Sequence, residues 1–273
     1  MKWRRSMKVL KKYLSVYGLM WKQVTDYRFE FVAELVCTLL PVFALYFLWD
    51  SVFSIEGSIK GMSFNEMILY IILARFVAMV ITPDFIFEIM DDIQSGEIQH
   101  FICKPINYIH YSFVKYLASK SEGIIFCTVL YSVLLGMLFG GESYWQSPMQ
   151  ILLFFIEVFV AMVFYFQMAM VIGLCSFWVY EISSWYYTLT FAIEFLAGGL
   201  FPLTLLPDQV RGVCKYLPFQ YMIYYPAQTL LMDINRDELV LYFFVLTGWI
   251  VVFALLLKIL WRNGIKHYEL IGG

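Results

Sequence analysis

Charged residues are scarce in this 273-residue chain: Asp, Glu, Lys and Arg make up 15% of it, compared with about 25% in soluble globular domains. Hydrophobic residues make up 62% and aromatic residues 20%, which is more apolar surface than one water-soluble core of this length can hide. The net charge of −2 supplies no basic face, so we expect no nucleic-acid partner. The composition excludes a water-soluble domain and favours a membrane protein.

The chain also lacks the signatures of common catalytic sites. It has no G-x-x-x-x-G-K-[ST] phosphate-binding loop and no G-x-S-x-G nucleophile elbow, so it cannot bind and split ATP or transfer acyl groups by those routes. Its three histidines, His100, His110 and His267, have no cysteine or carboxylate at metal-ligand spacing. The sequence therefore predicts that the chain is not an enzyme and holds no metal or cofactor.

Cysteine is present, but not in a functional pattern. The five cysteines are odd in number and widely spaced, and most lie inside apolar runs. This arrangement predicts neither a disulfide framework nor a zinc site. We interpret these residues as small buried side chains.

Long apolar runs are what the chain has instead. A helix crosses a hydrocarbon core of about 30 Å with about 20 residues. Backbone groups that face lipid must be satisfied within the segment, and no run shows the alternation of a barrel strand. We therefore predict an all-α integral membrane protein, with one transmembrane domain over residues 1–273 and six transmembrane helices at residues 31–53, 64–87, 123–139, 149–176, 185–201 and 239–261.

Lys and Arg positions set the predicted orientation, because basic loops resist translocation. An even number of spans places both termini on one side. That side carries most of the 19 basic residues, in the N-terminal segment, the second-to-third connection and the C-terminus. The opposite side has only Lys60, Arg211, Lys215 and Arg236. We therefore expect both termini to be cytoplasmic.

Residues 1–30 are predicted to form an N-terminal amphipathic helix at the inner membrane surface. Apolar residues recur at spacings of three and four, and basic residues occupy the rest of the helical wheel. The basic face would meet anionic lipid, whereas the alternative is a solvated tail that only sets topology. The apolar residues are Trp3, Met7, Leu10, Leu14, Tyr17 and Trp21.

Residues 88–122 form a polar interruption between the second and third spans, which we name the elbow. Asp91 and Asp92 suit the start of a helix, Gly96 bends the backbone, and Pro105 ends helical structure. A second amphipathic piece is expected at residues 108–120. The elbow is thus predicted to be folded rather than a flexible loop.

The elbow helix has an apolar face that needs burial. Exposed apolar side chains on a short surface helix usually expect a partner. The alternative is that they pack only against this chain's own helices. The apolar residues are Ile93, Ile98, Phe101 and Ile102, while Glu97, Gln99 and Lys104 remain polar.

A second interrupted region, residues 202–232, follows the fifth span on the outer side. It is mostly apolar, but its backbone is broken repeatedly by glycine and proline. We predict two short re-entrant helices whose backbone groups are covered by protein. The interrupting residues in and just before this segment are Gly198, Gly199, Pro202, Pro207, Pro218 and Pro226.

Three charged residues lie within predicted spans and away from the span ends: Arg75, Glu157 and Glu194. Each would cost about 2.5–3.5 kcal/mol if exposed alone to lipid, so each is expected to face the protein interior and find a partner. We predict that Arg75 pairs with Glu194, since both are near mid-span. The pair is either purely structural or takes part in substrate passage or gating.

Four stretches match one known family in their order along the chain. They are IQSGEIQHFICKPIN (93–107), SFWVYE (176–181), GGLFPLTLLP (198–207) and LPFQYMIYYPAQTLL (217–231). Together they resemble the membrane subunits of type-2 ABC exporters, in the branch with six helices and no fused ATPase. Each stretch alone is weakly specific, and Cys103 stands where leucine is more usual.

The resemblance implies that the elbow is a coupling helix set in a cleft of a separate ATPase subunit. Closure of two ATPases, which would bind ATP and magnesium, would then switch the spans between inward-facing and outward-facing states. The second inner turn would make a smaller contact of the same kind. The residues implied in coupling are Ile93, Gly96, Glu97, Phe101, Lys104, Pro105 and Glu181.

The resemblance also implies a bacterial cytoplasmic membrane and a pathway lined by two permeases, either identical or a related pair. We interpret most of the aromatic and methionine residues on the fourth span as packing against lipid or neighbouring helices; the alternative is that they line a route for an amphipathic substrate such as a drug, an antimicrobial peptide or a lipid. The residues are Phe154, Phe155, Phe159, Met162, Phe166, Met168 and Met170. Two alternatives stay open. One is a carrier driven by an ion gradient with Glu157 and Glu194 as proton sites, and the other is a membrane scaffold or immunity protein that binds a toxin without moving it.

Overall fold

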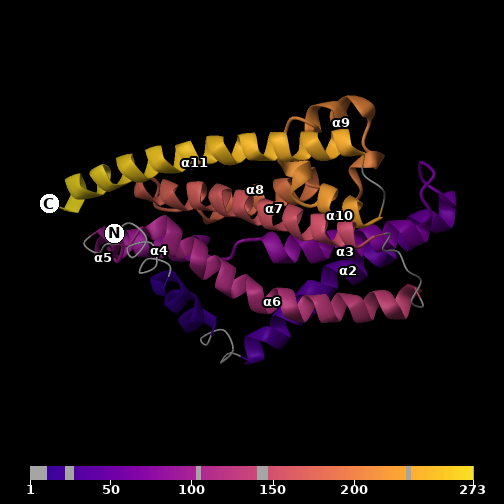
Figure 1. The fold of residues 1–273 in the computed structure, drawn as a ribbon, viewed down its shortest axis with the longest axis horizontal. Coiled ribbons are helices and arrows are strands. Elements are labelled where there is room, and N and C mark those ends of the chain that lie inside the picture. The colour runs from indigo at the N-terminus through magenta and orange to yellow at the C-terminus, as the bar shows by residue number, and fades with distance from the viewer. Residues whose placement is uncertain (1–10, 22–27, 103–105, 140–146, 232–234, 273) are drawn as a thin grey trace.

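The computed structural model describes residues 11–21, 28–102, 106–139, 147–231 and 235–272 (Figure 1). Over these ranges the chain forms α-helices and short 3-10 turns, and no strand occurs apart from an isolated bridge between Ile59 and Met62. Five of the described helices are long and apolar enough to cross a membrane. The predicted all-α integral membrane fold is confirmed.

These five helices correspond to five of the six predicted spans. They are α2 (Arg28–Glu56), α3 (Phe64–Ile81), α6 (Tyr108–Phe139), α7 (Pro148–Leu174) and α11 (Arg236–Gly272). The remaining predicted span, residues 185–201, is the helix α8 (Ser183–Leu196), which has 14 residues. A helix of this length rises only about 21 Å, so α8 is too short to cross the hydrocarbon core by itself.

Three predicted helix ends differ from the structure. Helix α3 ends at Ile81 rather than near Phe87, because Pro83 has no N–H to continue the helix. The amphipathic piece at 108–120 and the span at 123–139 are a single helix, α6, in which Ser119 and Ser121 donate to carbonyls of the preceding turn. Helix α11 continues past the predicted end at Trp261 and extends to Gly272.

Helix α3 lies at the centre of the fold. Nearly all of its side chains from Met67 to Ile81 are buried, because α2, α6, α7 and α10 (Tyr224–Leu231) pack around it. Helix α7 packs in turn against α11 and α4 (Ile86–Gln94). By contrast, few of the described apolar side chains of α2 and α11 are fully buried, so parts of these helices are available to lipid or to another protein chain.

The connections between the long helices gather at two opposite ends of the molecule (Figure 1). One end holds α4, α5 (Gln99–Ile102) and the C-terminal end of α11, and η1 (Cys175–Phe177) packs on α4 and α11. The other end holds the α2–α3 turn and the segment after α8. We call these the inner end and the outer end, following the predicted orientation.

Residues 11–21 are helical and pack against the beginning of α6. The Tyr17 hydroxyl lies 2.7 Å from Ser121 Oγ, and the Tyr13 ring contacts the edge of His110. Leu14 and Leu19 remain exposed. This segment therefore joins the inner end, and its predicted contact with lipid stays a prediction because residues 1–10, with Trp3, Met7 and Leu10, lie outside the described ranges.

Candidate coupling surface and intramembrane site

The elbow begins with α4 and turns at Gly96. Gly96 has a φ of +86°, in the left-handed region that glycine adopts without steric cost, so the predicted bend is present. The predicted helix start at Asp91 and Asp92 is wrong, since α4 begins at Ile86 and both aspartates lie in its second half. The break that precedes α4 determines where the helix starts. Lys104 and Pro105 lie outside the described residues.

The apolar face of the elbow is covered by the chain itself. Ile93 and Ile98 are buried, and the Phe101 ring packs on Tyr108 and Tyr111 of α6 at centroid distances of 4.9 and 5.0 Å. The prediction that these side chains are exposed and await a partner is therefore wrong for the described residues. The exposed surface of the described part of the elbow is therefore mainly polar.

An open hollow of about 380 Å³ lies between α4–α5 and the start of α6. Asp92 accepts a hydrogen bond of 2.6 Å from the Tyr108 hydroxyl, and Glu88 pairs with Lys115 at 2.6 Å. Negative charge predominates around the hollow, so it suits a basic group. Its charged lining residues are Glu88, Asp91, Asp92, Glu97 and Lys115.

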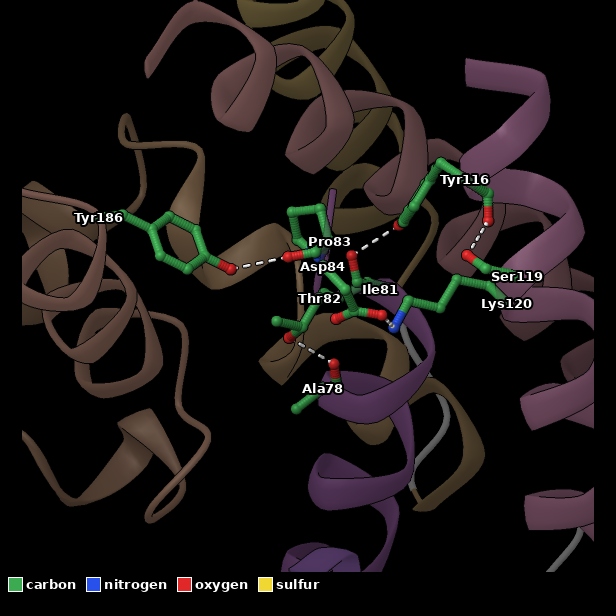
Figure 2. Close-up of polar contacts among 9 residues, drawn as sticks. All are labelled: Ala78, Ile81, Thr82, Pro83, Asp84, Tyr116, Ser119, Lys120 and Tyr186. Carbon is green, nitrogen blue, oxygen red and sulfur yellow. Dashed lines mark hydrogen bonds and ion pairs between the residues drawn. The ribbon is translucent and has the colours of Figure 1, made fainter. Parts of the chain in front are cut away.

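A break between α3 and α4, residues 82–85, was not foreseen in the sequence, and we call it the inner break (Figure 2). Its free carbonyl groups accept hydrogen bonds from tyrosines on two other helices. Tyr116 of α6 donates to the Ile81 carbonyl at 2.6 Å, and Tyr186 of α8 donates to the Pro83 carbonyl at 2.7 Å. Buried backbone groups are rarely left unpaired, so these hydroxyls let the helix stop within the protein.

An ion pair adds to the inner break. Lys120 Nζ of α6 lies 2.6 Å from Asp84 Oδ2. The lysine side chain is only 9% exposed, whereas the aspartate is 67% exposed. The pair therefore fastens the inner break to α6 from the solvent side.

The second inner turn, predicted at residues 177–184, connects η1 to α8 and lies beside the elbow. The Gln94 side-chain amide of α4 donates to the Tyr180 carbonyl. Glu181 is exposed, and its carboxylate accepts hydrogen bonds from Ser183, which lower the pKa of Glu181. Trp178 and Tyr180 also expose much of their surface. The two inner segments are thus neighbours, and their contact with one shared ATPase stays a prediction.

Arg75 of α3 and Glu194 of α8 form an ion pair through Nη1 and Oε1. The Arg75 side chain is 10% exposed and that of Glu194 is 30% exposed. The predicted pairing is therefore present, although its role in substrate passage stays a prediction. The Glu194 carboxylate is therefore partly accessible at the surface of this single chain.

Glu157 of α7 lies apart from any basic partner in the described residues and is fully buried. Its Oε2 accepts a hydrogen bond of 2.6 Å from Thr229 of α10, and its backbone carbonyl accepts one of 3.0 Å from the Tyr242 hydroxyl of α11. Glu157 thus joins three helices near the outer end. This arrangement is consistent with a structural role.

The segment after α8 contains two short α-helices, as predicted. These are α9 (Asp208–Cys214) and α10, separated by the 3-10 turns η2 (Leu203–Leu205) and η3 (Phe219–Tyr221). Each proline of the segment stands at the N-cap or in the first turn of one of these elements, where its missing N–H is tolerated. They are Pro202 before η2, Pro207 before α9, Pro218 before η3 and Pro226 in α10.

Residues 197–202 leave α8 and form the outer break. Gly198 has a φ of +82°, and its carbonyl accepts a hydrogen bond of 2.6 Å from the Tyr70 hydroxyl of α3. The backbone N–H of Tyr224 donates to the Ala197 carbonyl at 2.9 Å, and that of Gly199 donates to the Glu194 carbonyl at 2.8 Å. The outer break is therefore held largely by backbone bonds.

Lys60 in the α2–α3 turn fastens the outer segment from the other side. Its ammonium group donates to three consecutive carbonyls, those of Thr204, Leu205 and Leu206, at 3.1–3.2 Å. These carbonyls end the η2 turn and would otherwise lack helical partners. The contact joins the first outer connection to the re-entrant segment.

The helices and the two interrupted regions together define a multi-pass α-helical membrane protein with a folded connection at one end and a segment of short helices at the other. A profile of ABC-2 family transporter proteins matches residues 39–272. The chain therefore belongs to the ABC-2 transporter family, and it is a permease, the membrane part of a transporter. Among curated proteins, none matches the chain.

Proposed function

We propose that this permease is the membrane subunit of an ATP-driven exporter in a bacterial cytoplasmic membrane. Two copies, or one copy and a related permease, enclose the pathway, and two separate ABC ATPase subunits bind ATP and magnesium. Both termini face the cytoplasm. The main support is membership of the ABC-2 family in a chain that carries no phosphate loop of its own.

The elbow and the second inner turn are the proposed ATPase contact. Because the apolar side of the elbow is already buried, recognition would depend on polar groups: the exposed Glu97 and Asp91 at the hollow, with Glu181 beside them. Such a surface fits basic side chains on the ATPase. Charge pairing of this kind steers association and sets register more than it adds affinity.

The pathway is proposed to lie along α8. A carboxylate that stays 30% exposed at membrane depth, such as that of Glu194, is costly against lipid, so this face is better placed against the second permease or the pathway. Aromatic side chains surround it, and an aromatic surface with one charged group suits an amphipathic cargo such as a drug, peptide or lipid. The exposed aromatic residues of α8 are Trp185, Tyr187, Phe191 and Phe195.

The methionine-rich face of α7 mostly packs within the protein, which is the interpretation that the sequence favours for most of its residues. Five of the candidate lining residues are buried in the single chain, and only Phe155 and Phe159 are exposed. The buried ones are Phe154, Met162, Phe166, Met168 and Met170. These five pack the core.

Reconstitution tests the proposal. The permease is purified with the ABC ATPase that co-purifies with it, placed in vesicles, and assayed for ATP-dependent movement of fluorescent amphipathic compounds. We expect transport only with ATP and an intact ATPase. Transport driven by an ion gradient without the ATPase would establish a secondary carrier, and toxin resistance that persists with a hydrolysis-dead ATPase would establish a binding protein.

Charge reversal tests the contact. Asp91→Lys combined with Glu97→Lys should weaken ATPase binding to the permease at least tenfold, because two attractive contacts become repulsive. The matched control is Glu56→Lys, which reverses an exposed acid at the outer end of α2. Equal ATPase binding by the double variant and the control would contradict the assignment.

A further inference from the structure

The inner end of α11 continues beyond the apolar run into a stretch where polar and apolar residues mix. Nothing in the proposed function requires these extra turns. They nevertheless remain helical and lie at the same end as α4 and α5 (Figure 1). The contacts of these turns with the rest of the chain indicate their structural role.

One set of contacts reaches the elbow. The Tyr268 hydroxyl accepts a hydrogen bond of 3.2 Å from Gln99 Nε2 of α5. It lies so close to Gly96 that a Cβ added there would be 3.0 Å from the Tyr268 oxygen. The Trp261 ring stacks on Tyr108 at 5.4 Å and 12°. Helix α11 therefore contacts the elbow at its bend and at its exit into α6.

A second set of contacts reaches the other inner turn. The Phe177 ring fills the space beside Gly264, where any Cβ would be 2.3 Å from Phe177 Cδ2. The same ring meets the Tyr268 ring edge-on at 6.3 Å. Trp178 stacks with His267 at 6.1 Å. Both inner segments thus rest on one stretch of one helix.

Helix α11 is continuous over 37 residues, which is about 55 Å. Near its outer end, Tyr242 bonds the Glu157 carbonyl, and Trp249 Nε1 donates to the Tyr216 carbonyl of the outer segment at 3.1 Å. One rigid element therefore contacts the elbow at one end and the re-entrant segment at the other.

We propose that the inner end of α11, residues 261–268, makes the elbow and α11 move as one body, and that Tyr268 is the positioning residue that fixes the elbow's orientation. This inference rests on the proposed function. Tyr268 acts through Gly96 and Gln99 and need not touch the ATPase. A push on the elbow would thereby reach the outer segment through α11.

The first test compares transport with ATP hydrolysis in vesicles that contain the full permease–ATPase complex. Tyr268→Phe keeps the ring and removes the hydroxyl, and Gln99→Ala removes the donor. We expect each to lower the cargo moved per ATP about fivefold, the factor for loss of one neutral hydrogen bond, with the hydrolysis rate and the melting temperature nearly unchanged. The double variant should lose no more than either single variant, because both remove the same bond.

Lys266→Ala, an exposed position on the same turns of α11, is the matched control and should transport normally. A parallel fall in hydrolysis, transport and melting temperature would indicate a packing role only and overturn the proposal. Unchanged cargo per ATP in both single variants would overturn it as well. If the wild-type complex shows no ATP-dependent transport, the proposed function itself fails, which is a distinguishable result.

A cross-link between the elbow and α11 provides a second test, in which a connection is added rather than a contact removed. Gln99→Cys and Tyr268→Cys are introduced together in a chain whose five native cysteines are replaced by serine or alanine, and a short bis-maleimide joins them. If the elbow and α11 move as one body, the cross-linked complex keeps its transport. Loss of transport with continued hydrolysis would mean that the elbow swings against α11, and would overturn the proposal.

Discussion

The two helix interruptions of this permease are built differently. At the inner break, the free carbonyls of Ile81 and Pro83 are paired with side-chain hydroxyls from two other helices. At the outer break, the Ala197 and Glu194 carbonyls are paired with backbone N–H groups, one side-chain hydroxyl, that of Tyr70, reaches the Gly198 carbonyl, and Gly198 adopts a left-handed conformation. Side-chain bonds can re-form over a range of angles, whereas a backbone turn has one geometry. We therefore expect the inner break to be the more adjustable of the two and the outer break the more rigid.

The largest effect is expected at the outer break. Gly198→Ala would force a Cβ to 2.7 Å from the Tyr70 hydroxyl and 3.1 Å from Tyr224 Cβ, at a φ of +82°. Strain and overpacking together should destabilise the fold by about 4 kcal/mol. The loss would appear as a lower yield of monodisperse protein and a lower melting temperature in detergent. Gly212→Ala, where no atom lies within 4 Å of the added Cβ, is the control, and equal stability of the two would contradict a rigid outer break.

The ion pair beneath the outer break gives the next largest effect. Glu194→Gln leaves the Arg75 guanidinium unpaired, and because arginine cannot become neutral, we expect a cost of about 3 kcal/mol. Arg75→Gln should cost less, because the Glu194 side chain that it leaves unpaired is 30% exposed, whereas that of Arg75 is 10% exposed. The exchange Arg75→Glu with Glu194→Arg should recover part of the stability. Melting temperatures of the wild type and the three variants in detergent measure this order, and equal costs for the two single variants would show that the charges are solvated.

A smaller effect is expected at the inner break. Tyr116→Phe and Tyr186→Phe each remove one hydroxyl from a carbonyl, at a cost of about 1–2 kcal/mol. Because these bonds fix the joint between α3 and the elbow, transport per ATP should change more than melting temperature does. Tyr187→Phe is the control, because Tyr187 neighbours Tyr186 on α8 and its side chain is exposed. Reduced stability with unchanged transport per ATP would show that the inner break is not a joint.

The smallest expected effect is the difference in stability between variants of the two lysines of α6. Lys120→Met should destabilise by about 1 kcal/mol, because Lys120 is 9% exposed in its pair with Asp84. Lys115→Met should change stability by less than about 0.5 kcal/mol, because Lys115 and Glu88 are 34% and 54% exposed and solvent screens them. As the salt concentration in the denaturation experiment increases, the difference in unfolding free energy between the two variants should decrease. If Lys115→Met lost more stability than Lys120→Met, the Glu88–Lys115 pair rather than the Asp84–Lys120 pair would be the main stabilising contact.

Much of this architecture could be predicted from the sequence. Apolar run lengths located the long helices, and the cost of an unpaired charge predicted the Arg75–Glu194 pair. Gly96 marked a bend because few other residues adopt its backbone conformation. These features depend on local chemistry or on the membrane as solvent.

Other features could not be predicted because they depend on tertiary neighbours. Pro83 and Asp84 were a visible signal for a break inside the second run, but the tyrosines that pair its carbonyls come from α6 and α8. The burial of the elbow's apolar face and the continuation of α11 to Gly272 also depend on packing partners. Periodicity alone could not distinguish an apolar face covered by the chain from one that awaits another protein.

The shortness of α8 has a consequence for the bilayer. With 14 residues, α8 leaves about 9 Å of a 30 Å hydrocarbon layer unspanned, and the chain fills that depth with broken backbone shielded by tyrosines and by Lys60. The bilayer beside α8 would therefore have to be locally thinner, or a neighbouring subunit would have to replace the lipid there. The thinned strip would be the shortest route by which a hydrophobic molecule could leave the protein for the outer leaflet.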